Sequence, residues 1–212
     1  EYGINQGKGV AIDGVVWAPV NCGYHATDYK YGKLYQWGRV YGQGFNTVDA
    51  SIPSLDYSAP VSLSTGQSAS YKNSFFISTS SYYYDWVNFQ NDELWNSGTD
   101  DNPVKGTYDP CPTGWRVPTY LELYSLTGNK SSSTTKDDQN GCWFSGSSPY
   151  SESVFRVFLP KAGYRDYNGA AYDRDNTGKY WSSSPDYDGA IHYTFSDSGN
   201  SMFNVWRSNG YS

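Results

Sequence analysis

The sequence predicts an α+β fold in which short strands and long irregular loops outnumber the helices. The 212 residues include 22 Tyr, 8 Trp, 9 Phe and 22 Gly but a single Met, and short aromatic runs broken by small residues favour strands over long helices. The predicted elements follow the order strands, one helix, then strands again, which is typical of α+β domains. Because no linker-like segment interrupts this order, we expect one domain over residues 1–212.

The charge balance argues against two classes of function. The net charge is −6 and the sequence pI is about 4.8. Without a basic run, binding to nucleic acid through its phosphates is not expected. No stretch approaches the roughly 20 apolar residues of a membrane-spanning helix. A composition low in Lys and rich in Tyr, Ser, Asn and Gly is typical of an exported protein, so we expect an extracellular or outer-membrane surface location.

Three strands are predicted in the first 40 residues. Residues 10–18 place short apolar runs on both sides of Asp13-Gly14, a dipeptide that strongly favours a two-residue hairpin turn. Residues 32–38 alternate well enough to form a third strand. The next segment, 42–80, is rich in Ser, Thr, Gly, Pro and Asn and is expected to form a long surface excursion.

The most constrained stretch lies in the middle of the chain. Three prolines and a glycine restrict the backbone over residues 110–118. Thr119 and Glu122 then have the spacing of a capping box, in which each side chain binds a backbone N–H of the first helical turn. This pattern predicts a helix over 120–127, and Gly128 suits its C-terminal end.

The C-terminal half is predicted to return to strands after a polar loop. Residues 129–149 are expected to form that loop. Strands are expected over 154–160 and 178–184. The last strand pair is predicted over 190–196 and 202–207, joined by a short polar turn.

Five sequence blocks occur in a fixed order along nearly the whole chain. They are Asp13-Gly14 with Trp17-Ala18 and Asn21, then residues 32–37, 111–119, 159–165 and 180–184. Together they resemble the Fibrobacter succinogenes major paralogous (FISUMP) domain, and the Cys-Pro-x-Gly-Trp-x-x-Pro-Thr block is specific. The resemblance implies a C-type lectin-like fold with short mixed or antiparallel strands, one or two short helices and long irregular loops. It also implies an exported surface protein of Bacteroidetes or related bacteria.

A subset of this family resembles the variable proteins of diversity-generating retroelements, whose last stretch is the diversified ligand-binding face. Residues 181–212 are similar to such a region. They contain no Lys and no Glu and are rich in Ser, Asp, Asn, Gly and Tyr, the residue types that antibody loops use for contact area and hydrogen bonding. The expected function is therefore non-enzymatic binding of a protein or glycan through 181–212.

Strand alternation selects candidate contact residues within this region. We expect Tyr193 and Phe195 to face the core, which places His192 and Thr194 outward. For each candidate the alternative interpretation is a polar turn or a core aromatic, most of all for Trp206 and Phe203. The candidate ligand-binding residues are Tyr187, Asp188, His192, Thr194, Asp197, Asn200, Phe203, Asn204, Trp206, Asn209 and Tyr211.

The sequence gives no pattern for catalysis. His25 and His192 are the only imidazole bases, and neither lies in the context of a nucleophile elbow or a cysteine protease. The three cysteines, Cys22, Cys111 and Cys142, have no zinc-site spacing. Their odd number prevents complete internal pairing, and the sequence assigns no bridge. We therefore predict no enzyme activity, no metal site and no cofactor.

Two other functions remain open. One is a structural or adhesive paralogue, such as a pilus-tip component, without a diversified site. The other is a calcium-dependent lectin, because oxygen ligands gather at residues 100–102 and 173–175; neither segment has EF-hand spacing, and solvated turns are the favoured interpretation. In every case the expected partner is a protein or glycan on another cell, phage or host surface. Membrane contact is expected only through a lipid anchor outside these residues.

Overall fold

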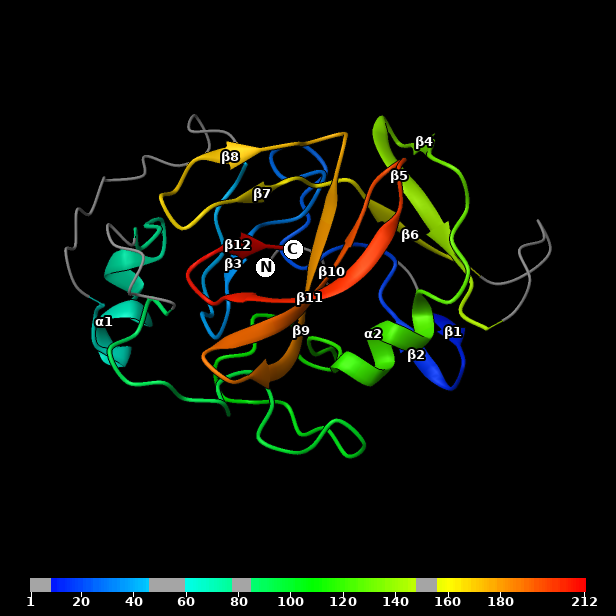
Figure 1. Cartoon of the computed structure of the whole chain (residues 1–212). Helices are drawn as coiled ribbons and strands as arrows, with labels where there is room; N and C mark the ends of the chain where they lie inside the picture. The colour runs from blue at the N-terminus through cyan, green and yellow to red at the C-terminus, as the bar shows by residue number, and fades with distance from the viewer. Residues whose placement is uncertain (1–8, 46–59, 78–84, 148–155) are drawn as a thin grey trace.

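The computed structural model describes residues 9–45, 60–77, 85–147 and 156–212, and these form antiparallel sheets with few, short helices (Figure 1). This arrangement is compatible with the predicted α+β class and equally with a mainly-β fold. The strands are β1 Val10–Ile12, β2 Val15–Trp17, β3 Tyr35–Gln36, β4 Thr134–Lys136, β5 Gln139–Phe144, β6 Val157–Pro160, β7 Tyr164–Arg165, β8 Ala171–Tyr172, β9 Gly178–Asp186, β10 Gly189–Phe195, β11 Asn200–Trp206 and β12 Gly210–Tyr211.

The first hairpin forms as predicted. Strands β1 and β2 pair antiparallel with Ile12 opposite Val15. Asp13 and Gly14 both have positive φ, 47° and 83°, as a two-residue type I′ turn requires. The Asp13 carboxylate also accepts hydrogen bonds from the backbone and side chain of Ser147 (2.7 and 2.8 Å), which lower its pKa. The hairpin is therefore attached to the segment that follows β5.

The predicted central helix is also confirmed. Helix α2 covers Tyr120–Leu126, and its capping box is complete: Thr119 and Glu122 each bind the backbone N–H of the other. The Glu122 carboxylate also accepts hydrogen bonds from both terminal guanidinium nitrogens of Arg116, at 2.5 and 2.7 Å. This pair fixes the helix start to the proline-rich segment in front of it. The other helical pieces are α1, Leu63–Gly66, and one short 3-10 turn, Ala69–Tyr71.

The prediction of a polar loop over 129–149 is wrong for the part that the structure describes. Strands β4 and β5 form a hairpin there, with Lys136 opposite Gln139. The turn between them uses Asp137 and Asp138 with φ of 51° and 63°, a conformation that Asp tolerates better than most residues. The polar β4 side chains hid the strand pattern.

Other strand boundaries shifted at their ends. The expected strand at 32–38 is reduced to β3, because Leu34 forms an isolated bridge with Gln43 instead of extending the ladder. Strand β9 continues two residues beyond the predicted 184. The last predicted pair is confirmed: β10 and β11 are antiparallel, with Gly189 opposite Trp206 and Phe195 opposite Asn200.

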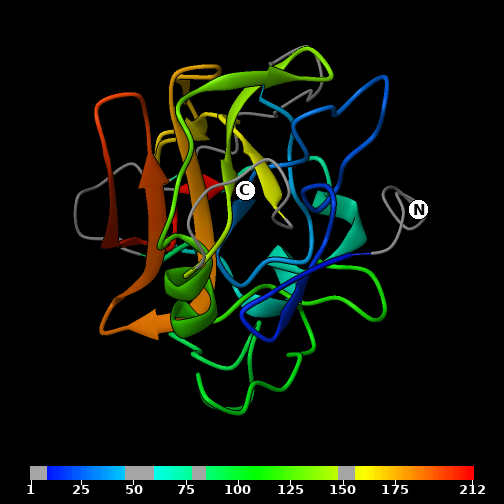
Figure 2. The same cartoon turned by 90° about the vertical axis from the view of Figure 1, so that its right-hand side faces the viewer.

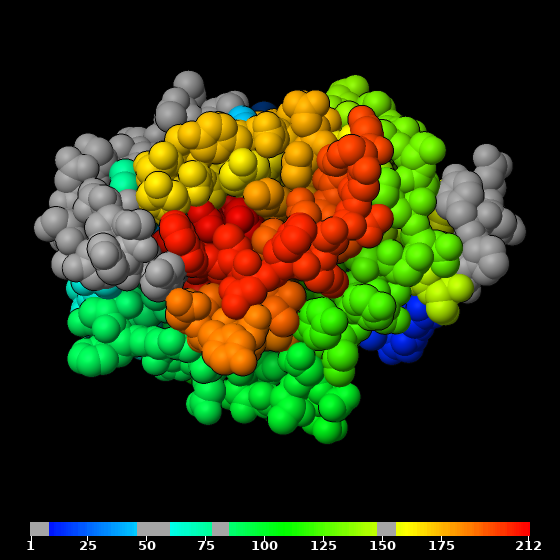
Figure 3. All heavy atoms as spheres, viewed as in Figure 1, coloured from blue at the N-terminus to red at the C-terminus, as the bar shows by residue number. Residues whose placement is uncertain are grey.

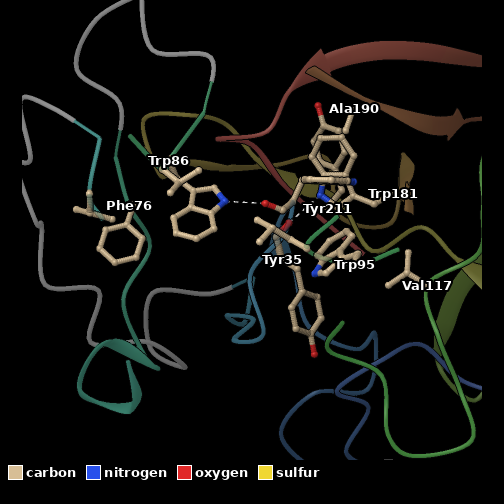
Figure 4. Close-up of a cluster of buried hydrophobic side chains, with 12 residues drawn as sticks. Tyr35, Phe76, Trp86, Trp95, Val117, Trp181, Ala190 and Tyr211 are labelled. Atoms are coloured by element: carbon tan, nitrogen blue, oxygen red, sulfur yellow. Dashed lines mark hydrogen bonds between the residues drawn. The ribbon is translucent and has the colours of Figure 1, made fainter. Parts of the chain in front are cut away.

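Strand β10 lies between β9 and β11 and is buried on both faces. Helix α2 contacts β9 and β10 on one side (Figure 2), and there Tyr193 and Phe195 join a cluster that we call the helix-side core. The opposite side meets a second cluster, the aromatic core (Figure 4). The helix-side core comprises Ile12, Leu123, Leu126, Cys142, Phe144, Val157, Leu159, Tyr180, Tyr193 and Phe195. The aromatic core comprises Tyr35, Trp37, Val61, Phe76, Trp86, Val87, Leu94, Trp95, Val117, Trp181, Ala190 and Tyr211.

Buried arginines hold the irregular segments against the sheets. Arg39 donates to three backbone carbonyls within residues 66–74, at 2.6 to 3.2 Å. Arg165 donates to the carbonyls of Gly44 and Phe45, at 2.6 to 3.0 Å. Both side chains are fully buried, so these hydrogen bonds replace the ones that the guanidinium groups would make with water. Among the described residues, no helix is long and apolar enough to cross a membrane.

Candidate ligand-binding face

Strand β11 and the turns on either side of β10 carry exposed side chains, and seven of these residues make up what we call the C-terminal face. Figure 3 shows the C-terminal residues, orange to red, running across the front of the molecule. The C-terminal face combines aromatic rings with amide, hydroxyl and carboxylate groups. The exposed residues of the face are Tyr187, Asp188, Asp197, Asn200, Ser201, Phe203 and Asn204.

Six predicted candidates are exposed as expected. Tyr187 is 88% exposed and Phe203 is 52% exposed, large values for aromatic side chains. Asp188, Asp197, Asn200 and Asn204 are also exposed. Two further candidates, Thr194 and Trp206, are half-buried. The Trp206 ring packs edge-on against Tyr167, with ring centroids 5.5 Å apart.

The outward positions predicted for His192, Asn209 and Tyr211 are wrong, because all three are buried. The His192 ring lies 4.7 Å from the Tyr211 ring and 5.9 Å from the Trp181 ring. Since β10 has a core on each side, the face opposite Tyr193 is covered rather than solvated. Asn209 folds inward because its backbone N–H and side-chain amide both donate to the carbonyl of Trp206.

Burial sets the protonation state of His192. Its enclosure by aromatic rings lowers its pKa to about 3, and the nearby Lys179 charge adds to this effect. A backbone hydrogen bond with Phe203 opposes the shift only in part. Its Nδ1 atom is buried and has no hydrogen-bond partner among the described residues. His192 is therefore a neutral packing residue at pH 7, behind the face rather than on it.

The turn that carries Tyr187 is held from two sides. Tyr187 has φ of 50°, an uncommon conformation for a bulky residue that must be supported by its surroundings. Asn204 donates to the carbonyl and the carboxylate of Asp186, both at 2.9 Å, and Gln90 donates to the Tyr187 carbonyl at 2.5 Å. An added Cβ on Gly189 would lie 1.9 Å from Asn204 Oδ1, so this position needs glycine.

Arg207 anchors the end of β11 in the core. Its guanidinium donates to the Gly189 carbonyl at 2.9 Å and to Asp92 at 2.6 Å, and it lies 4.4 Å over the Trp37 ring. Asp85 is 3.8 Å away. Burial raises the Asp85 pKa to about 6, because at this distance the attraction of Arg207 does not offset the loss of solvent. For Asp92, partial burial acts upward, but the bonds from Gln90 and Arg207 leave the pKa lowered.

The chemistry available on the C-terminal face is contact chemistry. Tyr187 and Phe203 offer rings for stacking, and the Asn and Ser side chains offer hydrogen bonds. The Asp197 carboxylate accepts hydrogen bonds from Lys161 Nζ, at 2.6 Å, and from the Ser133 hydroxyl. These hydrogen bonds lower its pKa. Within the described parts of the chain, no group of three or more His, Cys, Asp or Glu side chains could hold a metal ion.

Sequence reasoning missed a groove that adjoins the turn. It is lined by residues 62–64 and 87–93 and includes Phe89, which is 80% exposed. Gln90 connects it to the Tyr187 carbonyl. The signal was present, because Asn88-Phe89-Gln90-Asn91 has the same aromatic and amide composition as the C-terminal stretch.

A second hollow lies beside α2, a cavity of about 370 Å³. Trp17, Trp115, Tyr180, Cys22 and Cys111 are among its lining residues. These side chains come from distant parts of the chain, so no local pattern in the sequence could predict the cavity.

Known proteins add no assignment to this geometry. Comparison of the chain with protein-family models, with curated proteins and with solved structures found no match.

Proposed function

We propose that the chain is a non-enzymatic binding protein with a C-type lectin-like fold of the FISUMP type. It is displayed on a bacterial surface and binds a protein or glycan through the C-terminal face. One observation carries the proposal: Tyr187, Phe203 and Asn204 are exposed, and β11, which carries two of them, is paired along its length with the largely buried β10. Exposed aromatic rings next to amide and hydroxyl groups are the composition that antibody binding loops use.

The rigidity of the support favours binding by this face. The turn is fixed by hydrogen bonds from Asn204 and Gln90, and β11 is fixed by the ladder to β10 and by Arg207. A surface that is already ordered loses less conformational entropy when it binds. Exposed Tyr and Phe rings on such a surface are suited to act as the main energetic contacts.

The experiment is a binding screen followed by a matched pair of variants. The fluorescently labelled chain is applied to a glycan array and to an array of extracellular proteins. For any ligand captured, Tyr187→Ala/Phe203→Ala is expected to weaken Kd at least tenfold, as loss of two central aromatic contacts does. The control is Tyr124→Ala/Leu121→Ala, which removes two side chains of 62% and 42% exposure from α2 and should leave Kd unchanged.

The same arrays separate the proposal from its alternatives. Binding is expected to persist in EDTA, whereas a calcium-dependent lectin would lose it. Equal loss of affinity in the face and control variants would contradict the assignment of the face. Failure to bind any array member in repeated screens at micromolar concentration would favour a structural or adhesive role.

A further inference from the structure

Two cysteines from distant parts of the chain meet at the cavity beside α2. Cys22 follows the first hairpin and Cys111 lies in the proline-rich segment, and both line this cavity. Cys22 also borders a different hollow, of about 390 Å³. Both residues are partly accessible, whereas Cys142 is fully buried in the helix-side core. Solvent and small thiol reagents can therefore reach the first two cysteines and not the third.

The contacts place Cys22 beside the backbone of the Cys111 segment. Cys22 Sγ donates to the carbonyl of Pro110 at 3.2 Å, the residue directly before Cys111. It also lies 3.3 Å from the Tyr35 hydroxyl. The Cys111 backbone is fixed, because its N–H donates to Asp109 at 2.8 Å and its carbonyl accepts from Lys105 at 2.8 Å.

We propose that Cys22 and Cys111 are a redox-active dithiol that an external disulfide oxidises to an internal Cys22–Cys111 disulfide. The bond joins the segment after the first hairpin to the rigid stretch that precedes α2, and so closes one rim of the cavity. It also constrains a loop of about 90 residues in the unfolded chain, and long loops are those that a cross-link stabilises most. This inference is independent of the proposed ligand-binding function.

The two thiols differ in the direction of their pKa shifts, and this difference sets their order of reaction. Donation from Cys111 lowers the pKa of the Cys22 thiol; burial opposes this, and the Tyr35 hydroxyl assists it. The same hydrogen bond, with burial, raises the pKa of Cys111. Since the thiolate is the nucleophile in disulfide exchange, Cys22 attacks first and Cys111 resolves the intermediate.

The exchange balances without any further reactant. The Cys22 thiolate attacks one sulfur of a disulfide R–S–S–R, forming a Cys22–S–S–R bond and releasing one RS⁻. Cys111 then loses its proton and attacks Cys22 Sγ, which expels the second RS⁻. The two thiolates released take up the protons lost by the two cysteines. The protein pair is oxidised by two electrons and R–S–S–R is reduced to two R–SH.

The experiment uses the folded chain and oxidised glutathione as the probe. The chain is reduced, freed of reductant, incubated with oxidised glutathione, alkylated with iodoacetamide and digested with trypsin. We expect peptide 9–30 to be linked to peptide 106–116, with the intact mass lowered by two hydrogen atoms. Peptide 137–156, which carries Cys142, is expected to stay unlinked.

Variants test the order of reaction and the effect on stability. Cys111→Ser is expected to accumulate a glutathione mixed disulfide on Cys22, whereas Cys22→Ser leaves Cys111 largely unmodified. Oxidation should raise Tm by about 10 °C in the wild type and in Cys142→Ser, and not in either pair variant. The proposal is overturned if wild-type Cys22 and Cys111 remain alkylatable after oxidation, or if the linked peptides include Cys142. The wild-type peptide map gives this answer even if a variant fails to fold.

Discussion

Strands β10 and β11 pair residue for residue but differ in their surroundings. His192 is opposite Phe203 and Ile191 is opposite Asn204; His192 is 4% exposed and Phe203 is 52% exposed. Neighbouring strands are only about 5 Å apart, so the change from core to surface takes place within one ladder. A side chain can therefore stand in solvent while its backbone is hydrogen-bonded to a largely buried strand.

The position of each strand in the sheet explains the difference. Strand β10 is central and has a core on each face, whereas β11 is the edge strand. Exposed edges tend to pair with other chains, and native proteins protect them with polar residues and short lengths. The exposed Asn200, Ser201 and Asn204 fit this requirement. Under the proposed function, the same residues both prevent edge pairing and bind the ligand.

The largest expected effect comes from removing Arg207, which follows β11 and is buried in the core. Arg207→Ala should lower the free energy of unfolding by about 3–5 kcal/mol, because it removes a fully buried cation and leaves the largely buried Asp85 unpaired, while Asp92, whose side chain is 51% exposed, loses the same partner nearer the surface. Urea denaturation measures this. The control is Lys30→Ala, which removes a surface ion pair with Asp138 and should cost less than about 1 kcal/mol. Similar losses for the two variants would show that Arg207 is not an anchor.

A second prediction uses pH to test His192, the buried residue of the His192–Phe203 pair. His192 has a folded-state pKa of about 3 against about 6.5 when unfolded, so only the unfolded chain takes up a proton between these values. The wild type should therefore lose stability as pH falls below about 6.5, and His192→Phe should lack this contribution. Between pH 6.5 and 4.5 the two proteins should diverge by about 2–3 kcal/mol.

Denaturant titrations at several pH values check this divergence. The raised pKa of Asp85, about 6, gives the opposite trend, since that contribution to stability is lost as pH rises from about 4 to 6. Both proteins contain Asp85, so the difference between their curves isolates His192. Parallel curves would mean that His192 takes up its proton in the folded protein as readily as in the unfolded chain. Burial would then not lower its pKa, and His192 would not differ electrostatically from an exposed residue.

The smallest expected effect is on the exposed side. Tyr187→Gly should change the free energy of unfolding by less than about 0.5 kcal/mol, because the ring is 88% exposed and glycine accepts the positive φ. Two residues away, Gly189→Ala should cost at least about 1 kcal/mol, since its Cβ would collide with Asn204. Thermal unfolding of both variants compares them. A larger loss for Tyr187→Gly would place Tyr187 in the framework.

Local patterns in the sequence were enough for the elements that local interactions define. The Asp13-Gly14 turn, the capping box of α2 and the β10–β11 hairpin depend on residues a few positions apart, and all three are present. Alternation along β10 correctly separated Tyr193 from His192. It could not show that a second core covers the His192 side, because Trp181 and Tyr211 arrive there from other strands.

The remaining errors have the same origin. Asn209 and Tyr211 are predicted as surface residues, yet Tyr211 lies opposite Tyr35, where β12 pairs with β3 from the first quarter of the chain. The meeting of Cys22 and Cys111 at one cavity likewise depends on tertiary folding. Only the β4–β5 hairpin was lost for a local reason, since its Asp137-Asp138 turn and polar strand resemble a loop. Long-range packing decides which of two strand faces is wet.

The clamp between Asn204 and Asp186 makes the chain a convenient scaffold for directed evolution. Because the turn shape is set by a side chain on the neighbouring strand and by a glycine, positions 187, 188, 201 and 203 can be randomised in a display library without redesigning the backbone. Asn204, Gly189 and Arg207 would be kept constant as the invariant frame of every library member.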